Sequence, residues 1–434
     1  MHRRILVGRL FSRAGDHAWD FAVPMAILKI FPQHLFLPIL YYFAARIGSV
    51  FLMPVIGAGL DHRSTRKSLV VASGVQVLGV GVGALILIAM SFQVVDQAAF
   101  TWSLTTFFFS VILILAGVVA ALGAGILDII VLNIVVPTLF DGSRLTAMNS
   151  KISQVDLAME VTAPLVAGFL LMWNFEGLRL AGFALIAAAN ILSFLPEIFL
   201  LLPRIPKHTL RNKVPEITST AQNIFSSIIY GWRNFFKEPV APSVLAYSFL
   251  WLSILSPHGV LLTTYLKGVW GLQESTLGVF RGMGAILGFA GTLVFPWFVK
   301  RMGLFKASSR FIGWQALMVF AALIAFFYVT LGQAVGIASL GFMVFILLSR
   351  AGLYGFCLGE LEIRQTMVAP EKRGRVNGFT SSWLNAMTLL VYGLGSVLAT
   401  PKGFGVMVVV SACAVVVGAV VFHRWQTRSN RPSQ

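Results

Sequence analysis

Apolar runs of about 20 residues recur along the whole chain and are separated by short polar and basic stretches. An α-helix of that length crosses roughly 30 Å of hydrocarbon. The pattern predicts an all-α polytopic membrane protein. Its twelve transmembrane helices are expected near residues 13–31, 36–60, 68–92, 101–136, 148–173, 178–202, 240–268, 275–299, 308–331, 335–362, 375–398 and 403–425.

Composition supports a chain whose solvent is lipid. Of the 434 residues, 57% are hydrophobic and 11% are charged, and the mean hydropathy is +0.84. The two cysteines, Cys357 and Cys413, lie in apolar stretches and predict neither a disulfide framework nor a paired-thiol metal site. Although the net charge is +17, the basic residues form short patches between apolar runs, so no nucleic-acid partner is expected.

The basic residues predict the orientation of the chain. Most of the 33 Lys and Arg residues fall at the termini and in the even-numbered connections, whereas the odd-numbered connections carry only Lys29, Arg179, Lys267 and Lys402. By the positive-inside rule, both termini are cytoplasmic. We expect a multi-pass protein of the cell (inner) membrane.

The longest segment without a transmembrane helix, Pro203 to Pro242, separates six predicted helices from six. It predicts an N-lobe at 1–202, a cytoplasmic linker at 203–239 with an amphipathic stretch near Ala221 to Phe236, and a C-lobe at 240–434. This plan resembles the major facilitator superfamily fold, in which two six-helix lobes surround a central cavity and rock to give alternating access.

The connection between the second and third helices, Gly57 to Lys67, resembles the cytoplasmic loop signature of that superfamily. Its Asp61 stands close to Arg63, Arg66 and Lys67, and an acid beside bases can form a gate of ion pairs. The alternative is an ordinary basic cytoplasmic loop, since the usual glycine after the acid is missing.

Two carboxylates lie in the first predicted helix, where a charge costs at least about 2.5–3.5 kcal/mol. Asp16 and Asp20 are four residues apart and share one helical face. A divalent cation or shared protons would relieve their repulsion, and hard oxygen ligands suit Mn²⁺, Fe²⁺ or Ca²⁺. In the alternative interpretation, Asp16 caps the helix near the interface and only Asp20 faces a cavity.

The sixth predicted helix contains Asn190, Ser193 and Phe194, followed by Pro196. Asn190 and Ser193 share a face, and the proline removes one backbone hydrogen bond, so we expect a local break that exposes carbonyl oxygens as ligands. A routine proline kink is the alternative.

The seventh predicted helix is interrupted by Ser256-Pro-His258-Gly259. Pro and Gly predict a break there. An imidazole at this position can bind a transition metal or carry a proton near neutral pH. A histidine bonded to a neighbouring carbonyl is the structural alternative.

Three stretches resemble the ferroportin family of iron exporters within the major facilitator superfamily. Residues 15–23, GDHAWDFAV, are similar to the first-helix motif of that family, and residues 141–149, DGSRLTAMN, are similar to its fourth loop and fifth helix. The third and most specific stretch starts with RAGLYGF at 350–356 and continues through Gln365 and Arg373-Gly374 to Asn377-Gly378. The resemblance covers most of the chain and best fits a bacterial member.

The resemblance implies a metal site in the N-lobe at Asp16 and Asp20, where animal ferroportins have a histidine at the position of Asp20. It also implies cytoplasmic gate contacts that involve Arg144, Asp156 and Arg373. In the C-lobe the cysteine and histidine ligands of the family are replaced by Gly259 and Val391. His258 is the candidate replacement ligand there, and control by the animal hormone hepcidin is not expected.

These observations predict an exporter of divalent transition metal, Fe²⁺ first with Mn²⁺, Co²⁺ and Ni²⁺ as alternatives, that exchanges metal for protons. Asp16, Asp20, Asn190, Ser193 and the Phe194 region form the predicted N-lobe site, with His258 in the C-lobe and with Asp61, Arg144, Asp156 and Arg373 as gating residues. We expect a monomer in the lipid bilayer with no permanently bound cofactor. The residues alone support only a transporter with a paired-carboxylate cavity.

Two other functions fit the sequence less well. In a drug or organic-cation antiporter, Asp16 and Asp20 would bind an amine. A site for a bulky cation needs several aromatic side chains around the cavity, and the sequence does not place enough of them there. A membrane enzyme or receptor-like scaffold is disfavoured because the sequence has no phosphate-binding loop and no serine–histidine–acid set at either membrane face.

Overall fold

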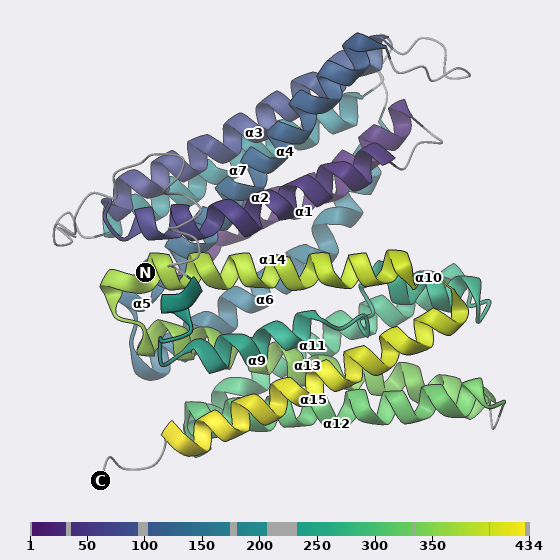
Figure 1. Cartoon of the computed structure of the whole chain (residues 1–434). Helices are drawn as coiled ribbons and strands as arrows, with labels where there is room; N and C mark the ends of the chain where they lie inside the picture. Colours follow the sequence, from purple (N-terminus) through teal and green to yellow (C-terminus); the bar gives the residue numbers. More distant parts are fainter. Residues whose placement is uncertain are drawn as a thin grey trace. The chain divides into compact units, whose positions relative to one another are not determined.

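Helices make up nearly all of the structure, a computed structural model that describes residues 2–31, 36–93, 103–173, 180–205, 232–332, 335–398 and 400–429 (Figure 1). Lipid offers the backbone no hydrogen-bond partners, so a chain this apolar satisfies its N–H and C=O groups within helices. The helices are α1 (His2–Ile30), α2 (Phe36–Leu60), α3 (Thr65–Gln93), α4 (Leu104–Asp128), η1 (Ile129–Val135), α5 (Val136–Leu139), α6 (Gly142–Leu171), α7 (Ala181–Leu201), η2 (Leu202–Arg204), α9 (Ala241–Trp251), α10 (Val260–Gly268), α11 (Glu274–Met302), α12 (Leu304–Thr330), α13 (Val335–Met367), η3 (Pro370–Lys372), α14 (Arg373–Val397) and α15 (Pro401–Ser429).

Nine helical spans within the described ranges are long and apolar enough to cross a membrane. They are α2, α3, α4 through α5, α6, α7 through η2, α11, α12, α13 and α15. Three further predicted crossings correspond to α1, to the pair α9 and α10, and to α14. These crossings are not among the nine spans. Helix α1 contains arginines and aspartates, the seventh crossing is split into helices of 11 and 9 residues, and α14 starts with basic residues.

The local structure differs from the sequence-based prediction in three places. Helix α1 starts at His2, well before the predicted residue 13. The fourth crossing ends in a π-helix, Ile129–Val135, that no pattern predicted. The break predicted at Pro196 was wrong, because α7 is one continuous helix that contains this proline. A proline removes only one helical hydrogen bond, and tightly packed neighbours hold the remaining turns in place.

The break predicted in the seventh crossing is confirmed. Helix α9 ends at Trp251 and α10 begins at Val260, and residues 252–259 between them are not helical (Figure 1). Arg350 of α13 donates from Nη2 to the carbonyl oxygen of Leu255 at 2.8 Å, and Ser411 of α15 accepts from the backbone N–H of Ile254 at 3.0 Å. Side chains of neighbouring helices therefore satisfy backbone groups that the break releases.

The chain forms two compact units. Unit 1 comprises 1–138, 155–231 and 369–385, and unit 2 comprises 139–154, 232–368 and 386–434. The first turns of α6 therefore pack in unit 2, and the first half of α14 packs in unit 1. Residues 206–231, which include most of the amphipathic stretch predicted near 221–236, lie outside the described residues.

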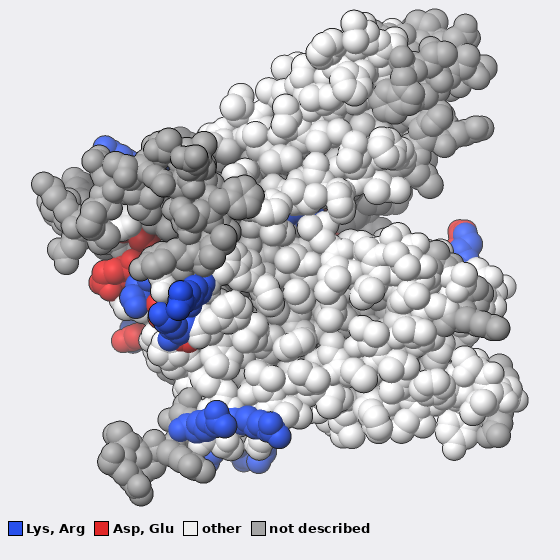
Figure 2. All heavy atoms as spheres, viewed as in Figure 1, with Lys and Arg blue, Asp and Glu red and all other residues white. Residues whose placement is uncertain are grey.

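Each unit has its own apolar core and an apolar exterior. The core of unit 1 is centred on Trp19, Val23 and Phe183, and that of unit 2 on Phe326, Phe342 and Val408. Large apolar side chains also face outward, such as Phe169 and Ile337. In the face shown, most of the surface along the helices is uncharged, and most of the charged side chains in view gather near helix ends (Figure 2). This distribution is the one expected of surfaces in contact with lipid.

Candidate metal site and charge network

Close packing of α1 against α7 builds the candidate site in unit 1. A Cβ atom at Gly8 would lie 2.9 Å from Cα of Glu197, and one at Gly15 would lie 3.1 Å from Cα of Asn190. Glycine at these two positions lets the helix backbones approach more closely than any other residue permits. Because Gly8 and Gly15 are seven residues apart, the contact runs along two turns of both helices, and it places Gly15, the residue before Asp16, against Asn190 and Ser193.

Asp16 is held by residues from two helices. Gln76 of α3 donates from Nε2 to Asp16 Oδ1 at 2.7 Å, and Arg13 Nη1 lies 3.5 Å from Asp16 Oδ2. Gln76 is itself buried, with α4 packed against it at Gly123. The carboxylate of Asp16 is therefore half-buried between α1 and α3, one residue beyond the α1–α7 contact at Gly15.

Several buried polar atoms on α3 and α7 have no hydrogen-bond partner. They are Gln76 Oε1 and Asn190 Oδ1 near Asp16, the amide nitrogen of Asn190, and Glu197 Oε1 two turns away at Gly8. An unpaired buried polar atom costs about 1–3 kcal/mol, so the oxygens of Gln76 and Asn190 are available to a bound group. Carboxylate and carboxamide oxygens are hard ligands of the kind that divalent cations use.

The other predicted ligands differ in their readiness to bind. Asp20 is exposed, one turn beyond Asp16, and its backbone carbonyl accepts a hydrogen bond from the Tyr42 hydroxyl. Ser193 donates to the carbonyl of Asn190 at 2.6 Å, which leaves its oxygen lone pairs available. Phe194 is 1% exposed and has no polar side-chain atom. Only its backbone carbonyl is a possible ligand, and this carbonyl belongs to the continuous helix α7.

A network of charges surrounds the candidate site. Arg9 contacts Asp156 through two nitrogens at 3.1 Å each and Asp128 at 2.8 Å. Arg13 contacts Asp128, Asp156 and Asp16. Asp156, predicted as a gating residue, therefore belongs within unit 1 to a network that joins α1, α4 and α6. Arg9, Arg13 and Asp128 were not predicted as site residues, although charged residues within an apolar helix indicate a functional site.

The other predicted gating residues lie at helix ends. Asp61 is 4% exposed and accepts hydrogen bonds from the backbone N–H groups of Gly374 at 2.7 Å and Arg375 at 2.8 Å. A carboxylate in this place is stabilised by the positive end of the α14 dipole. Arg373, the first residue of α14, is 9% exposed, whereas Arg144 at the start of α6 is exposed.

Side-chain hydrogen bonds that the sequence did not predict join α6 to α13 within unit 2. Asn149 donates to Gln365 Oε1 at 2.7 Å and accepts from Gln365 Nε2 at 3.2 Å. Thr146 donates to Glu362 Oε1 at 2.6 Å. These residues belong to the stretches that carry the ferroportin resemblance, but their pairing depends on a separation of 216 residues that sequence spacing does not reveal.

His258 has a different environment from Asp16. It is half-buried in the break of the seventh crossing, where a Cβ atom at Gly284 of α11 would lie 3.5 Å from its Cε1. The charges that act on its ring come from Arg350 and Arg281. Within the described residues, no group of three or more His, Cys, Asp or Glu side chains is arranged to hold a metal ion. The candidate site in unit 1 therefore relies on amides and a hydroxyl as well as acids.

Comparison with known proteins identifies the family. The ferroportin family model, "Ferroportin1 (FPN1)", matches residues 1–415. The chain belongs to the ferroportin family. It is 38% identical to the protein named ferreportin of Bdellovibrio bacteriovorus over 425 residues, which cover 98% of this chain and 94% of that protein.

Solved structures agree with this family assignment and establish the fold. A bacterial homologue of the iron transporter ferroportin, solved in an outward-facing state with soaked iron, has a TM-score of 0.87 and 36% identity over 99% of this chain and 100% of that one. The proton:xylose symporter XylE of the major facilitator superfamily has a TM-score of 0.68 at 15% identity, over 97% of this chain and 95% of its own. The protein is thus a membrane transporter with the twelve-helix fold of that superfamily, and not an enzyme.

Proposed function

We propose that this transporter exports a divalent transition metal, Fe²⁺ first, by alternating access and in exchange for protons. The observation that carries the proposal is the half-buried carboxylate of Asp16 beside Gln76, with unpaired buried oxygens on Gln76 and on Asn190, which packs against Gly15. Asp20, Ser193 and the backbone at Phe194 complete the candidate ligand set. The relatives described as iron transporters support Fe²⁺ as the cargo.

The charge network explains why such a site accepts a cation. Arg9 and Arg13 are matched by Asp128 and Asp156, and this leaves Asp16 in contact with one arginine that it shares with two other acids. The carboxylate of Asp20 makes no ion pair with the described residues. A divalent ion between Asp16 and Asp20 would replace the missing positive charge, and protons taken up by the same carboxylates would do so after metal release.

Aromatic side chains near the two carboxylates argue against a bulky organic cation as the cargo. Trp19 and Tyr41 are 4% and 5% exposed and belong to the apolar core of unit 1. Trp19 packs against Phe183 with ring centroids 5.4 Å apart. These rings are occupied by the core and are not free to stack on a drug-sized amine.

We place the protein in the inner membrane as a monomer with both termini in the cytoplasm, since basic residues gather at the termini and even-numbered connections. His258 is the one candidate ligand in unit 2. The charges that act on its ring come from two arginines and not from acids, and it is proposed to assist proton coupling more than metal capture.

Proteoliposomes test the proposed function. The purified protein is reconstituted with a metal-sensitive dye and a pH-sensitive dye inside, and Fe²⁺, Mn²⁺, Co²⁺ and Ni²⁺ are added in turn. We expect Fe²⁺ flux with opposite proton movement, competition by the other three ions, and flux at the level of empty liposomes for the Asp16→Ala, Asp20→Ala double variant. Transport of ethidium without any metal flux would overturn the proposal in favour of an organic-cation antiporter.

A further inference from the structure

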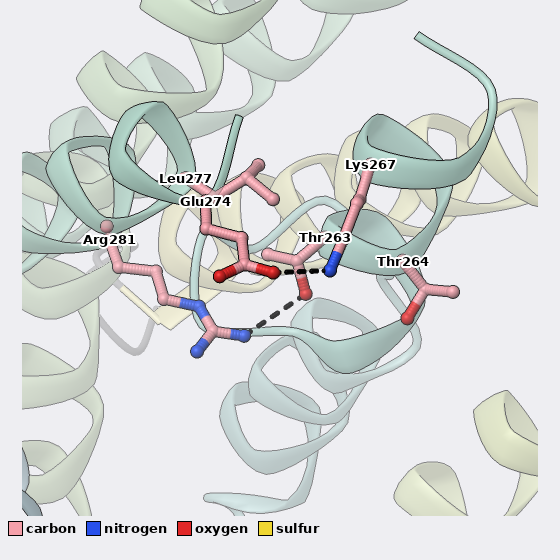
Figure 3. Close-up of a pocket in the computed structure, with 7 residues that line it drawn as sticks. Thr263, Thr264, Lys267, Glu274, Leu277 and Arg281 are labelled. Atoms are coloured by element: carbon pink, nitrogen blue, oxygen red, sulfur yellow. Dashed lines mark hydrogen bonds and ion pairs between the residues drawn. The ribbon is translucent and has the colours of Figure 1, made fainter. Parts of the chain in front are cut away.

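A cavity of about 290 Å³ lies between α10 and α11 in unit 2, and none of its lining residues belongs to the candidate metal site of unit 1. Its lining is mostly polar and consists of Thr263, Thr264, Lys267, Glu274, Leu277, Gly278 and Arg281 (Figure 3). The two helices present these residues at helical spacing, with Thr263 and Lys267 one turn apart on α10 and with Glu274, Gly278 and Arg281 on one face of α11.

Arg281 is the unusual member of this lining. It lies about 10 Å along α11 from Glu274, within a helix that is apolar enough to cross a membrane. Its side chain is exposed, and an exposed cation within a membrane-crossing helix requires an anionic partner or a wet cavity. Its guanidinium makes one hydrogen bond, from Nη2 to Thr263 Oγ1 at 3.1 Å, and no ion pair with the described residues. Because Thr263 is neutral, the charge of Arg281 stays uncompensated.

The neighbouring acid is already paired. Lys267 Nζ contacts Glu274 Oε1 at 2.6 Å, and the dashed lines in Figure 3 show this pair beside the separate Arg281 to Thr263 bond. Their side chains are 59% and 81% exposed, so the pair is weak and can rearrange around a ligand. The cavity therefore holds two cations against one carboxylate and has a net positive lining.

We propose that this cavity binds a phosphate group, held by the guanidinium of Arg281 together with Thr263, Thr264 and Lys267. Arginine offers five N–H donors in a planar fork that matches the oxygens of phosphate, and threonine hydroxyls and a lysine ammonium add further donors. The phosphate comes either from the solution or from the headgroup of a phospholipid, since both present the same oxyanion.

Gly278 provides a way to fill the cavity without a change of charge. A Cβ atom at this glycine would meet nothing within 4 Å, so a side chain placed there projects into open space. Leucine is a better helix former than glycine and keeps α11 intact. Gly313 of α12 is equally open and exposed, and Gly313→Leu is the matched control for Gly278→Leu.

The test uses full-length, metal-free protein in maltoside detergent, which contains no phosphate. Calorimetry measures binding of inorganic phosphate in one arm and of short-chain phosphatidylglycerol in the other. We expect one saturable site for at least one probe, with affinity lowered at least tenfold in Arg281→Gln and in Gly278→Leu and unchanged in the controls Arg310→Gln and Gly313→Leu.

The two arms identify the source of the phosphate. Binding of the lipid alone assigns a headgroup site, and binding of inorganic phosphate assigns a site for the soluble ion. Absence of binding in both arms overturns the proposal, as does parental affinity in a folded Gly278→Leu or Arg281→Gln variant. Since no metal is present, the result does not depend on the proposed export function.

Discussion

The α1–α7 contact in unit 1 and the broken crossing in unit 2 handle charge within the membrane in opposite ways. At α1 the arginines face acids, with Arg9 and Arg13 in contact with Asp128, Asp156 and Asp16. At the break, Arg350 bonds the carbonyl of Leu255 and a serine hydroxyl, and Arg281 bonds a threonine hydroxyl. The first region has oxygens to offer a cation, whereas the second has cations of its own.

This difference supports the proposal that the cargo binds in unit 1. A metal ion at Asp16 would meet carboxylates and unpaired amide oxygens, while a metal ion at His258 would meet one imidazole and the repulsion of two guanidinium groups. We therefore expect the two halves, despite their common helical plan, to differ in metal binding.

The largest effect is expected from the carboxylate pair. Asp16→Ala and Asp20→Ala should each lower metal affinity by at least about 100-fold, because loss of an outer partner of a metal ligand already costs about 10-fold to 100-fold. Calorimetry with Mn²⁺ in detergent measures the change, with Glu371→Ala, an exposed acid in η3, as the control. Unaltered affinity in both folded variants would remove these aspartates from the site.

The unpaired oxygens should give the next largest effect. Gln76→Ala and Asn190→Ala should each lower metal affinity by about tenfold, because each removes an unpaired oxygen near Asp16. Gln315 of α12 is also buried with an unpaired Oε1, so Gln315→Ala is a matched control in unit 2. Equal losses in Gln76→Ala and Gln315→Ala would show that the effect is a general loss of stability.

Much of this fold could be predicted from hydropathy alone, because lipid forces the chain into helices of a fixed minimum length. Hydropathy describes three crossings least well: α1, the pair α9 and α10, and α14. These crossings contain Asp16, the break with His258, and the backbone N–H groups that Asp61 caps. Polar residues that serve a function weaken the signal by which a transmembrane helix is recognised.

The composition of the site was harder to predict than the fold. Asp16, Asn190 and Ser193 could be selected as charged or polar residues within apolar helices. Gln76 could not, since an amide in α3 gains meaning only when Gly123 and the α1–α7 contact place it beside Asp16. In the same way, Asp61 was expected to meet basic side chains, and its hydrogen bonds to backbone N–H groups of α14 depend on a helix more than 300 residues away.

A smaller effect on affinity is expected from His258→Ala, about threefold to tenfold, because one neutral ligand among cations contributes little. The variant should act on pH dependence instead. Metal and proton compete for the same imidazole lone pair, so metal affinity should fall as the pH is lowered. Loss of part of this slope in His258→Ala assigns coupling to the histidine.

Flux assays with a proton readout complete that test. If His258→Ala keeps the full pH dependence and the same number of protons exchanged per metal ion, coupling belongs to Asp16 and Asp20 and the histidine is structural. The Val260→Ala variant, at the start of the neighbouring helix α10, is the control for disturbance of the break.

The smallest effect on affinity is expected at Asp61, where the readout is conformation. Its carboxylate accepts two hydrogen bonds at the start of α14, and each such bond to a charged group contributes about 1.5–3 kcal/mol. Asp61→Asn keeps an acceptor but removes the charge that the helix dipole favours. We therefore expect metal affinity within about twofold of the parent, together with faster thiol labelling of a cysteine placed at Val376, which is 1% exposed. The native Cys357 and Cys413 are first replaced by serine.

Arg144→Gln should increase labelling less, because this arginine is exposed at the start of α6. If labelling of Val376→Cys were the same with Asp61 and with Asn at that position, the contact would not hold the cytoplasmic gate, and Asp61 would serve only as a helix cap.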